Sequence, residues 1–212
     1  MRIRNNPQAE IHLRALGHFL LEPEKASPLD LDGIFPGKPV YLELGMGRGG
    51  FLLRMARSHP DRAFIGVEML KEVLAQGVRR AEAEGLENCR FVWTRIREID
   101  TWFRPGAVAG IYLNFSDPWP KERHGKRRLT HPDCLARYRR ILAPGGFVQF
   151  RTDNRELFEY SLNAFLESDF AVRNVRLDWH SHRDSAGAPR TEYEEKFAQS
   201  GKSIYQLEAF PR

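Results

Sequence analysis

Residues 42–51 read LELGMGRGGF, and this stretch decides the fold class. It follows the short apolar run 39–41 and precedes residues 51–56, which have the composition of a helix. The order strand, glycine turn, helix is typical of an α/β ligand-binding unit, because glycine lets the backbone turn sharply and come close to a ligand. The N–H groups of the helix start offer that ligand the positive end of a dipole.

Three glycines of this turn, Gly45, Gly47 and Gly50, satisfy the dinucleotide pattern G-x-G-x-x-G. Two carboxylates narrow the choice of ligand. Glu68 ends the next apolar run, about twenty residues after the turn, where a carboxylate can accept both hydroxyls of a ribose. Glu43 precedes the turn; it would repel a pyrophosphate and attract an ammonium group. A ligand with ribose and ammonium favours S-adenosylmethionine over NAD, and an ordinary βα turn with two solvated acids is the alternative.

Apolar strand-like runs alternate with helix-like runs from residue 39 onward. Strands are expected at 40–44, 63–67, 90–93, 110–115 and 146–151, and helices at 50–56, 70–84, 132–142 and 155–166. Short apolar strands joined by helices predict an α/β fold, with a mostly parallel sheet and helices on both faces. The last strand-like runs, 170–177 and 203–210, predict a C-terminal antiparallel hairpin added to that sheet.

Residues 1–38 are expected to form an N-terminal arm and helix. Residues 11–21 have apolar side chains at helical spacing, and 22–38 are rich in Pro, Asp and Gly and predict a loop. Arg2, Arg4 and Arg14 either contact phosphates or lie in solvent. Residues 39–212 then form the main domain of a chain that is a single domain overall.

Composition limits the partners and the compartment. The chain has 212 residues and a net charge of +5, which mildly favours a polyanionic partner. Its two cysteines, Cys89 and Cys134, argue against a disulfide framework and against a cysteine metal site, and they fit a reducing cytoplasm. The sequence shows no signal peptide and no apolar run of membrane-spanning length, so we expect a cytoplasmic protein that does not enter a membrane.

A second constellation, NFSDPWPK at residues 114–121, follows the fourth expected parallel strand. Two prolines stiffen this loop, and Asp117 precedes one of them, which favours an extended backbone. Ligands of such sheets gather at the carboxyl ends of the strands, so Glu43, Glu68 and Asp117 are expected on one rim. Trp119 either covers a base or packs against the prolines.

Residues 121–128 read KERHGKRR, in which five of eight residues are Lys or Arg. Most charge runs are solvated faces. This run adjoins the expected active loop, which favours contact with phosphates.

Together these motifs resemble the bacterial tRNA (guanine-N7-)-methyltransferase family of the TrmB type. The resemblance is carried by residues 42–51, 64–69, 114–128, 150–155 and the TEYEEKF motif at 191–197. It implies a Rossmann-like methyltransferase fold, S-adenosylmethionine as the methyl donor and the variable-loop guanine of tRNA as the acceptor. A homodimer is compatible with it.

The resemblance also implies a role for each matching residue. The cofactor-binding residues are Glu43, Gly45, Gly47, Glu68 and Asp117, and Asp117 is also the catalytic residue. The substrate-binding residues are Lys121, Asp153, Thr191, Glu192, Tyr193 and Glu194. The RNA-contacting residues are Arg123, His124, Lys126, Arg127 and Arg128.

Two positions depart from the family pattern. Arg95 stands where relatives usually carry an acid near adenine, and a guanidinium cannot accept from the adenine amino group. Met46 stands where relatives often have a smaller residue beside the cofactor. Some matching residues also have local interpretations: Thr191 and Glu194 fit a capping box, and Asp153 or Asn154 could cap the helix that follows.

The expected chemistry needs no strong base, because guanine N7 carries a lone pair and no proton. Asp117 would hold the guanine edge and oppose the positive charge of the product. An NAD-dependent oxidoreductase and an RNA-binding protein with a degenerate methyltransferase fold are the alternatives. His180 and His182 lack further ligands at suitable spacing, so no metal is expected.

Overall fold

The computed structural model describes residues 13, 17–22, 28–185, 191, 194 and 202–212. The chain divides into two compact units, Met1–Arg104 and Pro105–Arg212, which are treated one after the other below. The boundary expected near residue 38 and the single-domain organisation stay predictions. Among the described residues, the helices are all too short or too polar to cross a membrane.

The first unit is built on three parallel strands, β1 (Val40–Leu44), β2 (Ala63–Glu68) and β3 (Cys89–Trp93), in the order β3-β2-β1. The register aligns their carboxyl ends, since Leu44 pairs with Val67 and Glu68 pairs with Trp93. Every residue of β2 is buried, as expected for the central strand of a parallel sheet covered on both faces.

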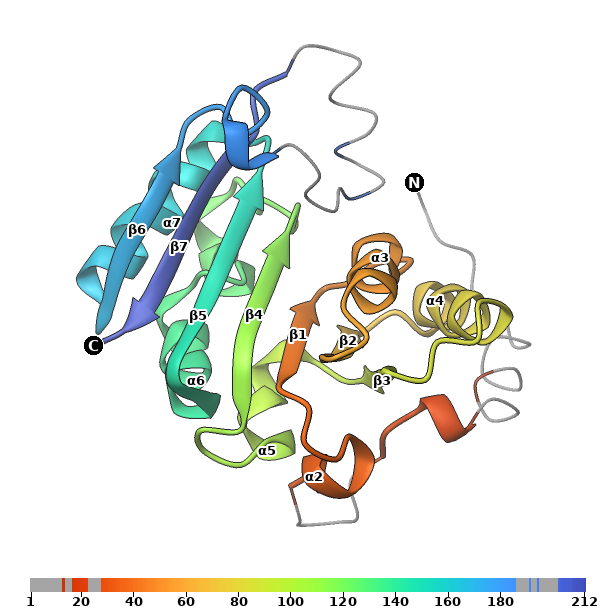
Figure 1. The fold of residues 1–212 in the computed structure, drawn as a ribbon. Coiled ribbons are helices and arrows are strands. Elements are labelled where there is room, and N and C mark those ends of the chain that lie inside the picture. Colours follow the sequence, from red (N-terminus) through yellow and green to blue (C-terminus); the bar gives the residue numbers. More distant parts are fainter. Residues whose placement is uncertain (1–12, 14–16, 23–27, 186–190, 192–193, 195–201) are drawn as a thin grey trace. The chain divides into compact units, whose positions relative to one another are not determined.

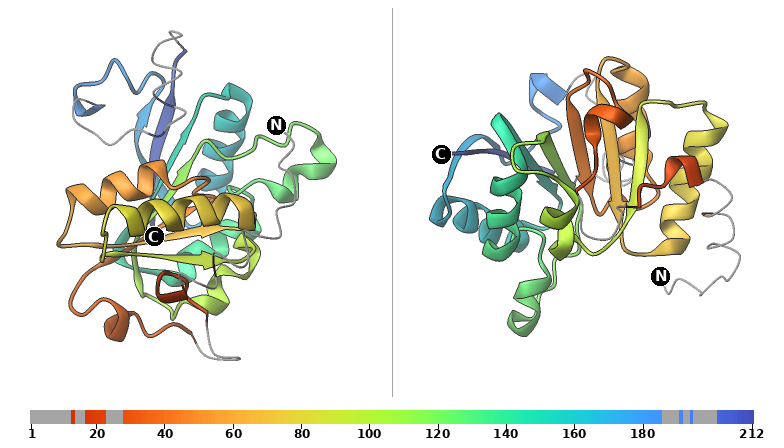
Figure 2. Two further views of the ribbon diagram at one scale, coloured as in Figure 1. Left: turned by 90° about the vertical axis from the view of Figure 1, so that its right-hand side faces the viewer. Right: turned by 90° about the horizontal axis from the view of Figure 1, so that it is seen from below.

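Two helices, α3 (Gly50–Ser58) and α4 (Lys71–Ala83), lie side by side and pack on β2 and β3 (Figure 2). The shorter elements are η1 (Gly17–Phe19), α2 (Leu31–Ile34), η2 (Ile96–Glu98) and α5 (Ile99–Trp102). The loop predicted over 22–38 is therefore wrong in part, because it contains α2. Residues 11, 12 and 14–16 of the helix expected at 11–21 lie outside the described residues, and its described end contains the 3₁₀ turn η1.

The described residues of the second unit form four strands in the order β4-β5-β7-β6 (Figure 1). These are β4 (Val108–Asn114), β5 (Leu142–Thr152), β6 (Phe170–Arg176) and β7 (Tyr205–Pro211). β4 and β5 are parallel, whereas β7 runs antiparallel to both β5 and β6. The predicted C-terminal hairpin is therefore confirmed.

Helices α6 (Pro132–Ile141) and α7 (Arg155–Glu167) pack on the strands of this unit. Two 3₁₀ turns complete it, η3 (Glu122–Arg127) at the periphery of the unit (Figure 2) and η4 (Arg183–Ser185). β5 begins at Leu142, four residues earlier than predicted from the turn-like sequence 143–146. These residues form an irregularity in the ladder, because Val108 pairs with Leu142 while Gly110 pairs with Phe147.

Both cysteines are buried free thiols. Burial raises the pKa of Cys89 to about 12, so this thiol stays protonated and unreactive at neutral pH.

Met46 is buried inside the first unit, with 5% of its surface exposed. A Cβ added to Gly66 would lie 2.2 Å from the Met46 sulfur, and one added to Gly77 would lie 2.6 Å from its terminal methyl carbon. The thioether thus fills space that two glycines leave open. Met46 thus anchors the glycine turn to the core, and its expected place beside the cofactor stays a prediction.

We predict that Gly66→Ala lowers the free energy of unfolding by about 1–3 kcal/mol, because the new methyl group overpacks the site of Met46. Adding Met46→Ala should make the Gly66→Ala effect much smaller, since the added methyl group then enters the vacated space. Gly125→Ala is the control, because a Cβ there meets nothing within 4 Å. Chemical denaturation measures the stability of the wild type, the two single variants, the double variant and the control. Strict additivity of the Gly66 and Met46 effects would contradict this packing.

Candidate active site

The glycine turn after β1 has a defined left-handed backbone conformation. Gly45, Gly47 and Gly49 have φ of +74°, +58° and +76°, values that glycine adopts at little cost. The N–H groups of Gly45 and Met46 both donate to the Val67 carbonyl, at 2.9 and 3.1 Å. The turn is therefore fixed against the end of β2, and α3 begins directly after it.

Glu43 lies behind this turn with 3% of its surface exposed. Its Oε2 accepts a hydrogen bond of 3.1 Å from the Leu52 N–H, in the first turn of α3. The positive end of the helix dipole stabilises an ionised carboxylate at this place. The turn thus has a fixed negative charge, which suits an ammonium group and opposes a phosphate.

Glu68 organises the same turn from the end of β2. Its Oε2 accepts from the Gly47 N–H at 3.1 Å, and its Oε1 accepts from the N–H groups of Met69 and Leu70 at 2.8 and 3.0 Å. The residue predicted to bind ribose therefore also joins the glycine turn to the start of α4. Each carboxylate oxygen can accept more than one hydrogen bond, so this structural role is compatible with ligand binding.

Large apolar side chains stand exposed beside Glu68. Met69 is 60% exposed and Trp93 is 42% exposed, and the Trp93 Nε1 donates to the Met69 carbonyl at 3.0 Å. Arg95 is also exposed, just beyond β3. Glu98 was not predicted from the sequence. Its carboxylate accepts a hydrogen bond of 3.3 Å from the Thr94 hydroxyl, which brings an acid to this end of β3. Only its position after a strand could have indicated it.

The loop after β4 carries Asp117 between two strained aromatic residues. Phe115 and Trp119 have φ of +50° and +43°, in the left-handed region that bulky residues seldom adopt. Asp117 is exposed, and within the described part of the chain its carboxylate has no hydrogen-bonding or ionic partner. The loop thus offers a carboxylate to a ligand from a fixed backbone.

The basic segment 121–128 divides into two groups. Lys121, Arg123, Lys126 and Arg127 are exposed. The Arg127 guanidinium lies 4.8 Å from the centre of the Trp119 ring, and Arg128 is half-buried and donates hydrogen bonds to the loop that carries Asp117. His124 packs edge-on against Trp119 with ring centres 5.7 Å apart. Arg128 therefore differs from the rest of the segment in facing the loop, and the contact of these residues with tRNA stays a prediction.

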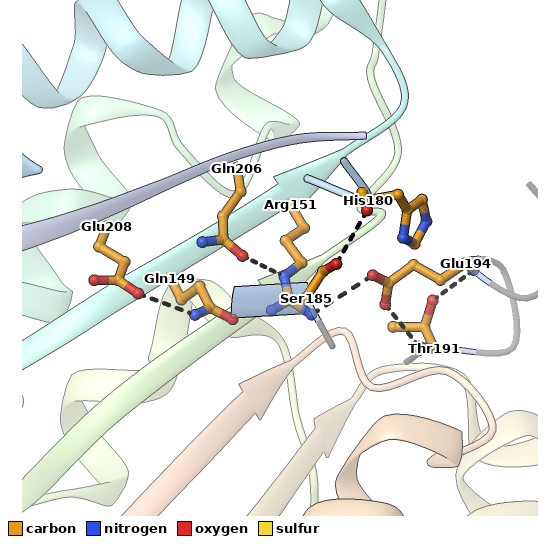
Figure 3. A network of polar contacts seen from close by, with 8 residues as sticks. All are labelled: Gln149, Arg151, His180, Ser185, Thr191, Glu194, Gln206 and Glu208. Carbon is orange, nitrogen blue, oxygen red and sulfur yellow. Dashed lines mark hydrogen bonds and ion pairs between the residues drawn. The ribbon is translucent and has the colours of Figure 1, made fainter. Parts of the chain in front are cut away.

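Arg151 is the centre of a buried polar network in the second unit (Figure 3). Its Nε donates to Gln206 Oε1 at 2.7 Å, and its Nη1 lies 3.6 Å from Glu194 Oε1. The Trp179 ring covers the guanidinium at 4.5 Å. Burial lowers the pKa of Arg151, and the charge of Glu194 opposes that shift. Arg151 was not predicted as a site residue, although an arginine at the end of an apolar strand is a usable signal.

Thr191 and Glu194 form a capping box (Figure 3). The Thr191 N–H donates to Glu194 Oε2 at 2.7 Å, and the Glu194 N–H donates to Thr191 Oγ1 at 3.0 Å. Both side chains are buried, Glu194 completely. The local interpretation of these residues is thus present in the structure, and their contact with substrate stays a prediction. The other predicted residues of this motif, Glu192 and Tyr193, lie outside the described residues.

Asp153 follows β5 and is half-buried. Its neighbour Asn154 caps α7, because its side-chain oxygen accepts from the Leu157 N–H at 2.7 Å. Of the two capping candidates, Asn154 is therefore the cap. The predicted contact of Asp153 with substrate stays a prediction.

Comparison with known proteins agrees with this geometry. Residues 37–207 match the family described as "Putative methyltransferase". The chain belongs to this methyltransferase family. It is similar to the tRNA (guanine-N(7)-)-methyltransferase of Levilactobacillus brevis, with 45% identity over 100% of this chain and 99% of the relative. It is also similar to the protein of the same name from Geobacillus thermodenitrificans, with 40% identity over 99% and 97% of the two chains.

Solved structures of other methyltransferases share the fold. The 16S rRNA methyltransferase KamB superposes with a TM-score of 0.67 at 14% identity, over 88% of this chain and 95% of that one. The antibiotic-resistance methyltransferase Kmr superposes with a TM-score of 0.62 at 21% identity, over 90% and 94%. The Rossmann-like methyltransferase fold, with mostly parallel strands and C-terminal antiparallel strands, is confirmed.

We predict that Glu194→Gln lowers the free energy of unfolding by about 3–5 kcal/mol, the usual cost of leaving a buried charge without its partner. Glutamine keeps the shape and can still accept from the Thr191 N–H, so the loss reports on the charge of Arg151. Glu159→Gln is the matched control, because its partner Arg155 and Glu159 itself are both exposed. Urea denaturation of both variants is the measurement. Equal stability of the two variants would contradict a structural role for the buried pair.

Proposed function

We propose that this methyltransferase transfers a methyl group from S-adenosylmethionine to N7 of a guanine in tRNA, at the variable loop. The observation that carries the proposal is similarity at 40–45% identity, over essentially the full chain, to proteins named tRNA (guanine-N(7)-)-methyltransferase. Roles in cofactor binding, base binding and methyl transfer can be assigned to described side chains.

The residues of the glycine turn fit S-adenosylmethionine. A Cβ on Gly47 would meet nothing within 4 Å, so space is open in front of the turn. We assign the ammonium group of the cofactor to Glu43 and its ribose to Glu68. Gly45 and Gly47 allow the backbone of the turn to come close to the cofactor. The exposed apolar faces of Met69 and Trp93 suit the adenine. When bound, the cofactor supplies an electrophilic methyl group on a sulfonium.

Glu98 supplies the acid that is absent at Arg95 in this proposal. Glu98 is exposed, and the Thr94 hydroxyl holds its carboxylate near the end of β3. A carboxylate there can accept from the adenine amino group, which the Arg95 guanidinium cannot do.

Asp117 acts on the guanine. The edge of guanine presents N–H groups that can donate hydrogen bonds to an available carboxylate. The base becomes cationic as the methyl group is transferred to its N7. The negative charge of Asp117 opposes that developing charge. Because N7 has no proton to remove, most of the rate enhancement comes from alignment of the base with the methyl group. We assign the surrounding tRNA to Lys121, Asp153 and the TEYE motif at residues 191–194.

Two exposed residues of the basic segment, Arg123 and Lys126, are assigned to tRNA phosphates. A tRNA-modifying role fits a cytoplasmic protein. A homodimer is retained as a prediction, which sedimentation equilibrium of the purified chain tests.

Two measurements test the proposed function. Calorimetric titration should show binding of S-adenosylhomocysteine and none of NADH, and tritiated S-adenosylmethionine should label unmodified tRNA. Binding of NADH would favour the oxidoreductase. Absence of heat with S-adenosylhomocysteine would favour an RNA-binding protein with a degenerate pocket.

We predict that Asp117→Ala and Asp117→Asn each lower the turnover number by about 100-fold or more, because the charge that opposes the cationic base is removed. Affinity for tRNA should remain nearly unchanged, since one exposed carboxylate contributes little to binding a polyanion. Single-turnover methylation and filter binding measure the two quantities. Wild-type turnover by Asp117→Asn would remove the carboxylate from the reaction.

The salt dependence of tRNA binding tests the basic segment. For a variant with both Arg123→Ala and Lys126→Ala, the slope of log K against log salt should shrink by about 0.7–0.9 for each phosphate that the variant no longer neutralises. The control carries Arg57→Ala and Arg139→Ala, which remove the same charge from residues paired with Glu84 and Asp169. An equal change in the control would mean that only the net charge matters.

A further inference from the structure

The backbone conformation of residues 115–119 needs stabilising contacts from outside the loop. Two bulky aromatic residues, Phe115 and Trp119, adopt φ of +50° and +43° at either end of Ser116, Asp117 and Pro118. Such residues persist in the left-handed region only when the surroundings enforce it. At the first end, the Phe115 N–H donates to the Arg151 carbonyl at 2.9 Å.

Arg128 holds the other end of this loop. Its Nε donates to the Pro118 carbonyl and its Nη2 donates to the Trp119 carbonyl, each at 3.1 Å. Guanidinium presents donors in a rigid planar fork, so one side chain can fix two consecutive carbonyls. The two bonds span the residue that follows Asp117 and the strained Trp119.

Arg128 is itself fixed from several directions. Its guanidinium lies 4.2 Å from the centre of the Tyr160 ring on α7. Its N–H donates to the Gly125 carbonyl at 3.0 Å, and its carbonyl accepts from the His131 N–H at 3.1 Å. The charge is therefore directed into the protein, unlike the exposed charges of Arg123 and Lys126 in the same basic segment.

We propose that Arg128 is a positioning residue, which clamps the Pro118 and Trp119 carbonyls so that the Asp117 carboxylate is held ready for the base, and that it does not bind tRNA phosphates. This inference rests on the proposed function for its catalytic consequence. The clamp itself is a property of the loop and can be measured without substrate.

Arg128→Ala and Arg128→Lys test the proposal together. Lysine keeps the charge but cannot donate in the geometry of the fork, so both variants should lower the turnover number by about 10- to 100-fold. The affinity for tRNA and the salt dependence of binding should match the wild type. Arg139→Ala, an exposed arginine paired with Asp169, is the control and should keep wild-type values throughout.

Hydrogen exchange followed by mass spectrometry measures directly how well Arg128 stabilises the loop. Both Arg128 variants should exchange faster in the peptide that contains residues 115–119, while peptides of β1 and β2 stay as in the wild type. Unchanged exchange in that peptide would overturn the clamp, whether or not the protein acts on tRNA.

The outcomes separate the two proposals. Failure of the wild type to methylate tRNA, together with faster loop exchange in the variants, would overturn the proposed function and leave the clamp standing. An active wild type with wild-type turnover in Arg128→Lys would overturn the positioning role. A weakened salt dependence in Arg128→Ala, equal to that of exposed residues, would identify Arg128 as a phosphate contact instead. If Arg128→Ala unfolds, the lysine variant alone decides.

Discussion

Arg151 carries a positive charge into the interior of residues 105–212, where an unpaired charge is costly. The segments around it are arranged to meet that cost. Glu194 supplies the opposite charge, Gln206 of β7 accepts a hydrogen bond, and Trp179 covers the guanidinium plane. The carbonyl of the same residue accepts from Phe115, where the Asp117 loop begins. Arg151 thus joins the motif that carries Asp117, through its backbone carbonyl, to the capping box of Thr191 and Glu194, through its guanidinium.

Carboxylates have the corresponding role in residues 1–104. Glu43 accepts from the start of α3, and Glu68 accepts from Gly47 and from the start of α4. The groups that we assign to the cofactor are therefore also those that shape its turn. This double use explains why a fold can keep such acids buried: the N–H groups of helix starts stabilise their charge.

The strands and the long helices could be predicted from the sequence because short apolar runs and glycine turns have few alternatives in a parallel sheet. The extension of β5 to Leu142 could not, since Pro144 and two glycines have the composition of a turn. The direction in which side chains point was harder to predict from the sequence than the strands and helices. Nothing in KERHGKRR distinguishes Arg128, which faces the loop, from Arg123, which is exposed. The packing of Met46 could not be predicted either, because the space over Gly66 and Gly77 exists only in the folded chain.

The central claim is that this methyltransferase modifies N7 of a tRNA guanine. The most direct test is to methylate unmodified tRNA with labelled S-adenosylmethionine and to cleave the product chemically at N7-methylguanosine. We expect cleavage at one guanine in the variable loop, in proportion to the label incorporated. Label that enters the tRNA without creating this cleavage site would contradict the claim.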